Sequence, residues 1–277
     1  MSKAASKSGS SVARHADFYH DAEVYDALHA PGTGGEAMVV AKLARRLTGK
    51  PRGTLRFYEP ACGTGRHLVA LARRGHACVG VDLEPGMVAF AQREAKRTGV
   101  AERASFVCGD MTQVVLDGSE RVDAAFCLIN SIRHLMSDRA MLAHLRSVRA
   151  SLLPGGVYIV GIELIEPDLA QPSEDVWSGR KHGVRVKQVV QYLPPEAGER
   201  VETVISTMLV RRVGTGGRRG SEQQVDSSYA LRTYTPSQWG AIIAKAGLEV
   251  AGVFNAEGVP RPKVTIGYYL WALRAKD

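Results

Sequence analysis

Two glycines and one aspartate form the pattern with the clearest chemistry. Gly63 and Gly65 stand in the run EPACGTG at 59–65, after a strand-like segment and before a helix-like one. Glycine lets a ligand approach the backbone closely in a tight turn, and the start of the next helix offers unpaired N–H groups. Asp82 ends the next strand-like segment, about 20 residues further on, where a carboxylate can accept hydrogen bonds from both ribose hydroxyls. The pattern predicts a site for a nucleoside-bearing ligand; the alternative is a structural turn with Asp82 as a helix cap.

A nicotinamide dinucleotide does not fit this pattern, because its site requires Gly-x-Gly-x-x-Gly and Leu68 stands where the third glycine belongs. The segments EPACGTGRHLVALARRG at 59–75 and VGVDLEPGMV at 79–88 instead resemble the first two motifs of class I S-adenosylmethionine-dependent methyltransferases. The resemblance continues through CGDM at 108–111 and the turn PGG at 154–156, covering about residues 55–165. It implies S-adenosyl-L-methionine as the methyl donor and S-adenosyl-L-homocysteine as the product.

The resemblance also implies which residues hold the donor. Gly63 and Gly65 would bring backbone against its methionine part, with Glu59 beneath the loop. The backbone from Cys127 to Asn130 would face its amino group. The other residues implied are Asp82 for the ribose, Asp110 for the adenine amino group, Met111 and Leu83 for the two faces of the adenine ring, and Tyr19 and Tyr25, which would close over the donor unless they are core aromatics.

Polar residues after the fourth strand-like segment are expected to face the acceptor. Asn130-Ser131-x-x-His134-Leu135 resembles a stretch of the glycine N-methyltransferase-like branch of small-molecule enzymes. The segment lacks the Asn/Asp-Pro-Pro-aromatic signature of enzymes that methylate exocyclic amines of bases, which argues against a nucleic-acid base. His134 could orient a substrate or take its proton, because the pKa of histidine lies near neutrality; helix capping or packing is the alternative. The other candidate bases are Glu163, His182 and Tyr229.

An arginine further along the chain is the remaining candidate for the acceptor site. Leu231 to Pro236 reads LRTYTP and resembles an Arg-x-Tyr-Thr-Pro segment that precedes a helix in related enzymes. Arg232 could hold a substrate carboxylate with two parallel hydrogen bonds, or it could bond the backbone of a helix or lid. We therefore take His134, Tyr229 and Arg232 as the catalytic candidates.

Short apolar runs and helix-like stretches alternate between residues 55 and 164, which is typical of parallel βαβ units. Prolines after residue 165 break this alternation, and strand-like segments separated by turns then indicate an antiparallel insertion. We expect parallel order to resume with a helix at 236–246 and strands at 248–254 and 264–275. The five earlier strands are expected at 55–60, 77–82, 104–110, 122–129 and 157–164, and the inserted ones at 184–193, 199–213 and 223–234.

These elements predict an α/β fold, a Rossmann-like, mostly parallel seven-stranded sheet with helices on both faces and an antiparallel β insertion as a lid after the fifth strand. The expected organisation has four parts. They are a disordered tail at 1–14, N-terminal helices and the donor-binding core at 15–165, an insertion covering the acceptor site at 166–234, and the last helix and strands of the core at 235–277.

The overall composition is that of a globular protein. Hydrophobic residues make up 45% and charged residues 23%, and the net charge is +8. The four cysteines form no Cys-x-x-Cys pair, so we expect buried thiols in a reducing compartment and no metal. The start of the chain lacks the apolar core of a signal peptide, and no run of about 18 apolar residues occurs, which predicts a cytoplasmic protein without a membrane partner.

We therefore expect an S-adenosylmethionine-dependent methyltransferase that acts on a small-molecule acceptor, by N- or O-methylation, as a monomer or homodimer. Two alternatives remain open. The basic balance and the arginines at 211–219 are compatible with an RNA or protein methyltransferase. A non-catalytic S-adenosylmethionine-binding protein would keep the same donor pattern. The sequence does not identify the acceptor or the general base.

Overall fold

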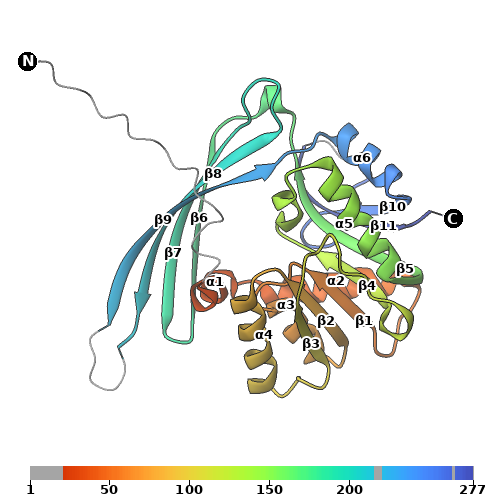
Figure 1. Cartoon of the computed structure of the whole chain (residues 1–277), viewed down its shortest axis with the longest axis horizontal. Coiled ribbons are helices and arrows are strands. Elements are labelled where there is room, and N and C mark those ends of the chain that lie inside the picture. The colour runs from red at the N-terminus through yellow and green to blue at the C-terminus, as the bar shows by residue number, and fades with distance from the viewer. Residues whose placement is uncertain (1–20, 215–219, 264–265, 277) are drawn as a thin grey trace, which may run out of the picture.

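The computed structural model describes residues 21–214, 220–263 and 266–276. A seven-stranded sheet forms its centre, in the order β10-β11-β5-β4-β1-β2-β3 (Figure 1). Strands β1 to β5 run parallel, and only β11 is antiparallel to its two neighbours. The strands are β1 (Arg56–Pro60), β2 (Ala77–Asp82), β3 (Ala104–Cys108), β4 (Val122–Cys127), β5 (Leu152–Leu164), β10 (Leu248–Phe254) and β11 (Gly267–Ala275). The predicted fold class is confirmed.

Helices cover both faces of this sheet, because successive side chains of a strand point to opposite faces. Phe57 points to the face packed by α2 and α3, whereas its neighbour Tyr58 points to the face packed by α5 and α6. Both side chains are fully buried. The helices are α1 (Ala22–His29), α2 (Thr33–Thr48), α3 (Arg66–Ala72), α4 (Pro85–Arg97), α5 (Asp138–Ser151) and α6 (Pro236–Lys245), with short 3-10 turns η2 (Gly118–Glu120), η3 (Ser131–His134) and η4 (Pro167–Leu169).

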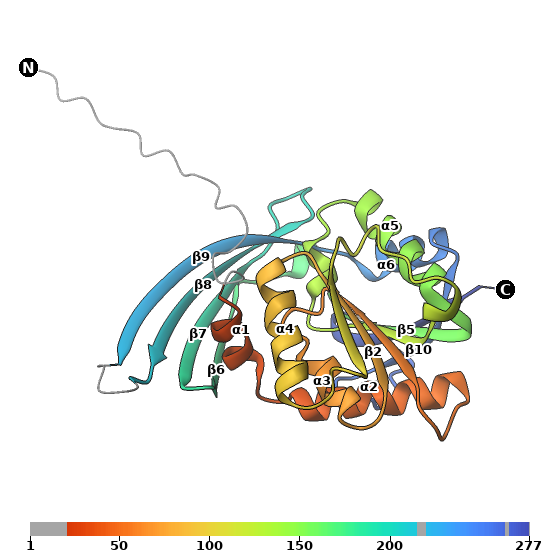
Figure 2. The same ribbon diagram turned by 60° about the horizontal axis from the view of Figure 1, so that its bottom comes forward.

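A second, four-stranded sheet lies beside the first and curves away from it (Figures 1 and 2). It is an antiparallel meander of β6 (Ser173–Lys181), β7 (Val184–Leu193), β8 (Val201–Arg212) and β9 (Ser221–Arg232). Helix α1 packs on one end of its inner face, where Val24 and Leu28 meet Val186 and Met208. The other end of that face turns toward the carboxyl ends of the central strands.

Three expectations about the elements were wrong. Strand β6 was not expected, because SEDVWSGRK at the edge of the second sheet is mostly polar and exposed and lacks apolar alternation. Strand β11 pairs antiparallel with β5 and β10, so parallel order does not resume at the end of the chain. Strand β5 begins at Leu152, five residues before the expected start. The predicted tail at 1–14 lies outside the described residues.

No helix in the described part of the chain is both long enough and apolar enough to cross a membrane.

Candidate active site

The loop between β1 and α3 has a backbone conformation that favours small residues. Ala61, Gly63 and Gly65 all have positive φ angles, of 58°, 53° and 70°. A Cβ at position 65 would overlap the Phe106 ring, so glycine is needed both for the turn and for packing. The loop then leads directly into α3, whose N-terminal residue is Arg66.

Asp82 ties this loop to the end of β2. Its Oδ2 accepts a hydrogen bond from the Gly63 backbone N–H (2.7 Å), and its Oδ1 accepts one from the Glu84 N–H (3.0 Å). Burial raises the pKa of Asp82 above its ordinary value, against the lowering effect of these hydrogen bonds. The structure thus brings together the glycines and the aspartate that the sequence pattern singled out.

The residues implied for adenine follow β2 and β3. Leu83 is apolar but 64% exposed, so its side chain does not pack into the protein core. Asp110 accepts a hydrogen bond from the Thr112 N–H at Oδ1 (2.7 Å), and the carbonyl of Met111 lies 3.0 Å from Nδ1 of His144. None of these residues lines the large cavity described next, so the structure separates an outer strip after β2 and β3 from an inner compartment.

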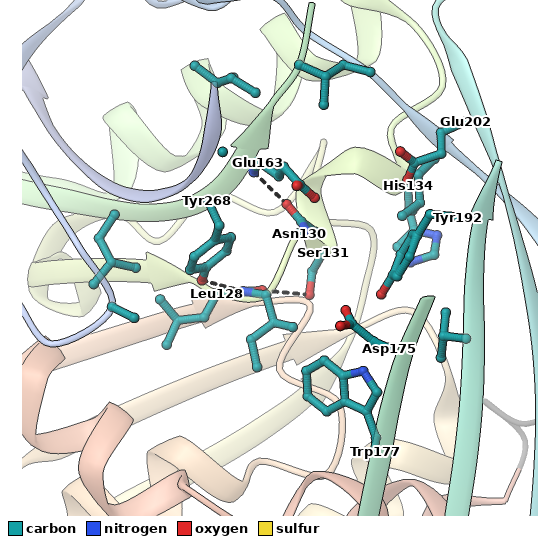
Figure 3. A pocket seen from close by; sticks show the side chains of 18 of the residues that line it. Leu128, Asn130, Ser131, His134, Glu163, Asp175, Trp177, Tyr192, Glu202 and Tyr268 are labelled. Atoms are coloured by element: carbon teal, nitrogen blue, oxygen red, sulfur yellow. Dashed lines mark hydrogen bonds between the residues drawn. The ribbon is translucent and has the colours of Figure 1, made fainter. Parts of the chain in front are cut away.

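A cavity of about 700 Å³ lies between the carboxyl ends of β1, β4 and β5 and the inner face of the second sheet (Figure 3). This volume lies within the usual range for small-molecule sites. Residues from distant parts of the chain line it. They include Tyr25 and His29 of α1, Glu59 of β1, Leu128 to Ser131, His134, Glu163 of β5, and Asp175, Trp177, Gln188, Tyr192, Glu202 and Tyr229 of the second sheet.

The turn after β4 is held in a costly conformation. Ile129 and Asn130 both have positive φ angles, of 52° and 63°. The Ile129 N–H donates to the Tyr268 hydroxyl (3.0 Å), and Oδ1 of Asn130 accepts from the Glu163 N–H (2.7 Å). A β-branched residue such as Ile129 rarely adopts such an angle, and residues held in this way cluster at functional sites. Cys127 itself is buried and does not line the cavity, while the backbone that follows it does.

A chain of charged side chains runs beneath the glycine loop. Nδ1 of His67 lies 2.8 Å from Oε1 of Glu59, and its Nε2 lies 2.8 Å from Oε2 of Glu36. Arg66 donates to the same oxygen of Glu36 (2.6 Å). Burial raises the pKa of Glu59, although His67 opposes this effect. The sequence interpretation missed His67 and Glu36, and only the position of His67 in the first turn of α3 could have indicated them.

Within this group of side chains, one buried oxygen has no hydrogen-bond partner among the described residues. Glu59 is 4% exposed, and its Oε2 makes no hydrogen bond with the described residues. A buried acceptor without a donor is costly unless a ligand supplies one. Because Glu59 lines the cavity beside the glycine loop, this oxygen is placed to accept a hydrogen bond from a ligand there.

The structure separates the predicted catalytic residues. His134 and Tyr229 both line the cavity and stack, with ring centroids 5.6 Å apart and an interplanar angle of 28°. Burial raises the pKa of Tyr229 to about 12, so its hydroxyl stays protonated near neutral pH.

Of the two tyrosines implied for the donor, Tyr25 lines the cavity, and burial raises its pKa too. Tyr19 lies outside the described residues.

Arg232 does not line the cavity, and protein atoms occupy its guanidinium. Its Nε and one terminal nitrogen bond Oδ1 of Asp138 (3.2 and 3.0 Å), and the other bonds the Met136 carbonyl (3.2 Å). These contacts hold the start of α5, which is the structural role considered as the alternative.

His182, a candidate base, lies in the turn between β6 and β7. Its Nε2 is 3.5 Å from Oε2 of Glu94, and the residue does not line the cavity.

Comparison with known proteins points to one enzyme class. Residues 58–156 match the family model described as "Methyltransferase domain". The chain is 34% identical over 143 residues to a dTDP-3-amino-3,6-dideoxy-alpha-D-glucopyranose N,N-dimethyltransferase of Streptomyces fradiae, which is 50% of this chain and 51% of that protein. It is 33% identical over 111 residues to a glycine/sarcosine N-methyltransferase of Halorhodospira halochloris, covering 40% and 41%. The chain thus spans about half the length, or less, of these curated relatives.

A solved structure extends the similarity to nearly the whole fold. DesVI of Streptomyces venezuelae superposes with a TM-score of 0.69 at 21% identity, covering 92% of this chain and 98% of that one. At this identity the similarity establishes the fold, including the second sheet. The family resemblance inferred from the two sequence motifs is confirmed. The chain therefore contains a methyltransferase domain at residues 58–156 and has the fold of class I S-adenosylmethionine-dependent methyltransferases.

Proposed function

We propose that this protein transfers a methyl group from S-adenosylmethionine to the nitrogen of a small-molecule amine. The observation that carries the proposal is the junction of the glycine loop, Asp82 and the unpartnered oxygen of Glu59 with a cavity large enough for an acceptor. Two curated relatives named as N-methyltransferases support nitrogen as the acceptor atom.

The residues around the loop would contact several parts of the donor. Asp82 has acceptor oxygens at the loop, where they can take hydrogen bonds from ribose hydroxyls while keeping the Gly63 N–H. Glu59 would hold the amino group. The remaining donor contacts proposed are Asp110 with the adenine amino group, Leu83 and Met111 with the adenine ring, the backbone after Cys127 with the methionine part, and Gly65 and Tyr25 with the loop side of the donor.

The donor supplies a methyl group already activated on a sulfonium, so the protein mainly has to align the acceptor and exclude water. An amine reacts only through a free lone pair, so a protonated amine must lose a proton in the cavity. His134 and Glu163 line the cavity and could receive this proton. Tyr229 cannot act as a base near neutral pH, because burial keeps its pKa at about 12, but its hydroxyl can orient the acceptor.

The second sheet completes the compartment and would act as its lid. It contributes Asp175, Trp177, Gln188, Tyr192, Glu202 and Tyr229 to the lining, opposite the carboxyl ends of the central strands. We extend the proposal to a cytoplasmic monomer or homodimer. Free thiols at Cys62, Cys78 and Cys127, all buried, fit a reducing compartment. Light scattering of the purified chain would give the oligomeric state.

The proposal is tested by donor binding and by methyl transfer measured separately. Calorimetry should show a saturable site for S-adenosylhomocysteine. Mass spectrometry with S-adenosylmethionine and a panel of primary amines, alcohols and carboxylic acids should show a mass increase of one methyl group on amines. A protein that binds neither S-adenosyl compound would overturn the proposal, as would transfer to alcohols alone.

A further inference from the structure

Carboxylates from both sheets line the cavity. Glu163 comes from β5, Asp175 from β6 and Glu202 from β8, and all three line the cavity (Figure 3). Arg66 is the one arginine or lysine among the described lining residues, and it is bonded to Glu36. The cavity lining therefore carries an excess of negative charge.

A single buried guanidinium serves two of these carboxylates. Arg133 is fully buried, with one terminal nitrogen 3.0 Å from Oε1 of Glu202 and the other 3.5 Å from Oε2 of Glu163. Its Nε donates to the Arg232 carbonyl (3.0 Å). Burial raises the pKa of Glu202, as does the charge of Glu163, while Arg133 opposes both. One positive charge leaves this group of carboxylates incompletely neutralised.

Two buried side chains of the second sheet keep acceptor atoms without donors. Glu202 is 6% exposed, and Arg133 occupies its Oε1, but no described residue donates to its Oε2. Gln188 is 4% exposed and gives its Nε2 to Ser206 (2.7 Å), which leaves its Oε1 free of any described donor. Both residues line the cavity. Carboxylate and amide oxygens that line a cavity in this way can accept hydrogen bonds from the N–H groups of a ligand.

Asp175 is also unpaired, and aromatic rings stand beside it. No described residue forms a hydrogen bond or ion pair with its carboxylate. Trp177 lies two residues further along β6, and Tyr192 lies on the neighbouring strand β7; all three side chains point into the cavity (Figure 3). The faces of aromatic rings attract cations and cover apolar carbon atoms.

We propose that Glu163, Asp175 and Glu202, with the Gln188 carbonyl and the rings of Trp177 and Tyr192, form a subsite that binds the acceptor amine in its protonated form. This inference rests on the proposed function and adds the charge state of the acceptor and the residues that select it. The subsite favours an ammonium ion over a hydroxyl group of the same shape and excludes a carboxylate. Arg133 keeps two of the carboxylates in place but does not contact the amine.

Matched probes test the subsite through binding rather than turnover. With S-adenosylhomocysteine present at saturation, calorimetry would compare cyclohexylamine with cyclohexanol, benzylamine with benzyl alcohol, and 3-amino-3-deoxyglucose with glucose, at millimolar concentrations. We expect at least one amine to bind about tenfold or more tightly than its hydroxyl partner, because a hydrogen bond to a charged group is the stronger kind.

The variant Asp175→Asn should remove most of this preference, since it keeps the shape of the side chain and lies on an exposed edge strand where folding is not at stake. Glu174→Gln is the matched control, because Glu174 is the adjacent residue on the opposite face of the same strand and does not line the cavity. It should bind the amine as the unaltered protein does.

Three results would overturn the subsite: equal binding of amine and hydroxyl probes, no detectable amine binding, or an amine preference that survives in Asp175→Asn. Normal binding of S-adenosylhomocysteine in those experiments would leave the proposed function standing and refute only the ammonium subsite. Absence of S-adenosylhomocysteine binding would instead refute the proposed function.

Discussion

Replacement of Asp82 tests the donor site most directly. In the structure its two oxygens hold the backbone N–H groups of Gly63 and Glu84, at 2.7 and 3.0 Å. Asp82→Ala removes both anchors, together with the hydrogen bonds that we propose for the ribose. Asp82→Asn keeps one acceptor oxygen and the side-chain shape but loses the charge.

The expected magnitude follows from the hydrogen bonds that a ribose would add. Loss of a hydrogen bond to a charged group costs about 1.5–3 kcal/mol. At about 1.4 kcal/mol for each factor of ten, Asp82→Ala should weaken S-adenosylhomocysteine binding about 10- to 150-fold. Asp82→Asn should lie between the alanine variant and the unaltered protein, because its amide can still accept one hydrogen bond.

Calorimetric titration with S-adenosylhomocysteine measures both dissociation constants, and thermal unfolding checks that each variant is folded. Asp117→Ala is a suitable control, because Asp117 is exposed and caps no helix through its side chain. A dissociation constant for Asp82→Ala within about twofold of the unaltered protein, in a folded sample, would refute a ribose role for this carboxylate.

Three further changes test how the structure supports the site. Gly65→Ala should lower the free energy of unfolding by about 1–3 kcal/mol, because the new Cβ meets the Phe106 ring at a positive φ; unchanged stability in urea would contradict this. Arg133→Met should lower it by about 3–5 kcal/mol by leaving Glu202 buried without its cation, and the double variant with Glu202→Leu should recover part of the loss. Glu36→Gln should destabilise the protein at neutral pH. Burial alone would raise the pKa of Glu36, but its histidine and arginine partners outweigh burial and lower that pKa to about 2. The difference in the free energy of unfolding between the unaltered protein and Glu36→Gln should therefore shrink as pH falls from about 4.5 toward 2. A difference that grows as pH falls would contradict this prediction.

The meeting of the glycine loop with Asp82 could be predicted from sequence because the two are close together along the chain. The glycine loop and the end of β2 are joined by one helix, and adjacent parallel strands bring their carboxyl ends to the same edge of a sheet. Local backbone requirements fix such a motif. The predicted seven-stranded sheet and its antiparallel insertion followed from the same local alternation.

The acceptor half could not be predicted in the same way. Arg232 looked like a substrate-binding arginine, but the packing of β9 against the start of α5 gives it to Asp138. Arg133, which the sequence interpretation passed over, is the buried partner of Glu202, 69 residues away.

What the sequence by itself determined is the donor-binding pattern, since a tight turn and a strand end impose their residue types locally. Only the tertiary structure decided which side chains share the acceptor cavity. Alternation along β6 and β8 places side chains on two faces, but the pairing of the strands and the curvature of the second sheet decide which face meets the central strands. Asp175 and Glu202 therefore became neighbours of Glu163 through long-range packing that no local pattern encodes.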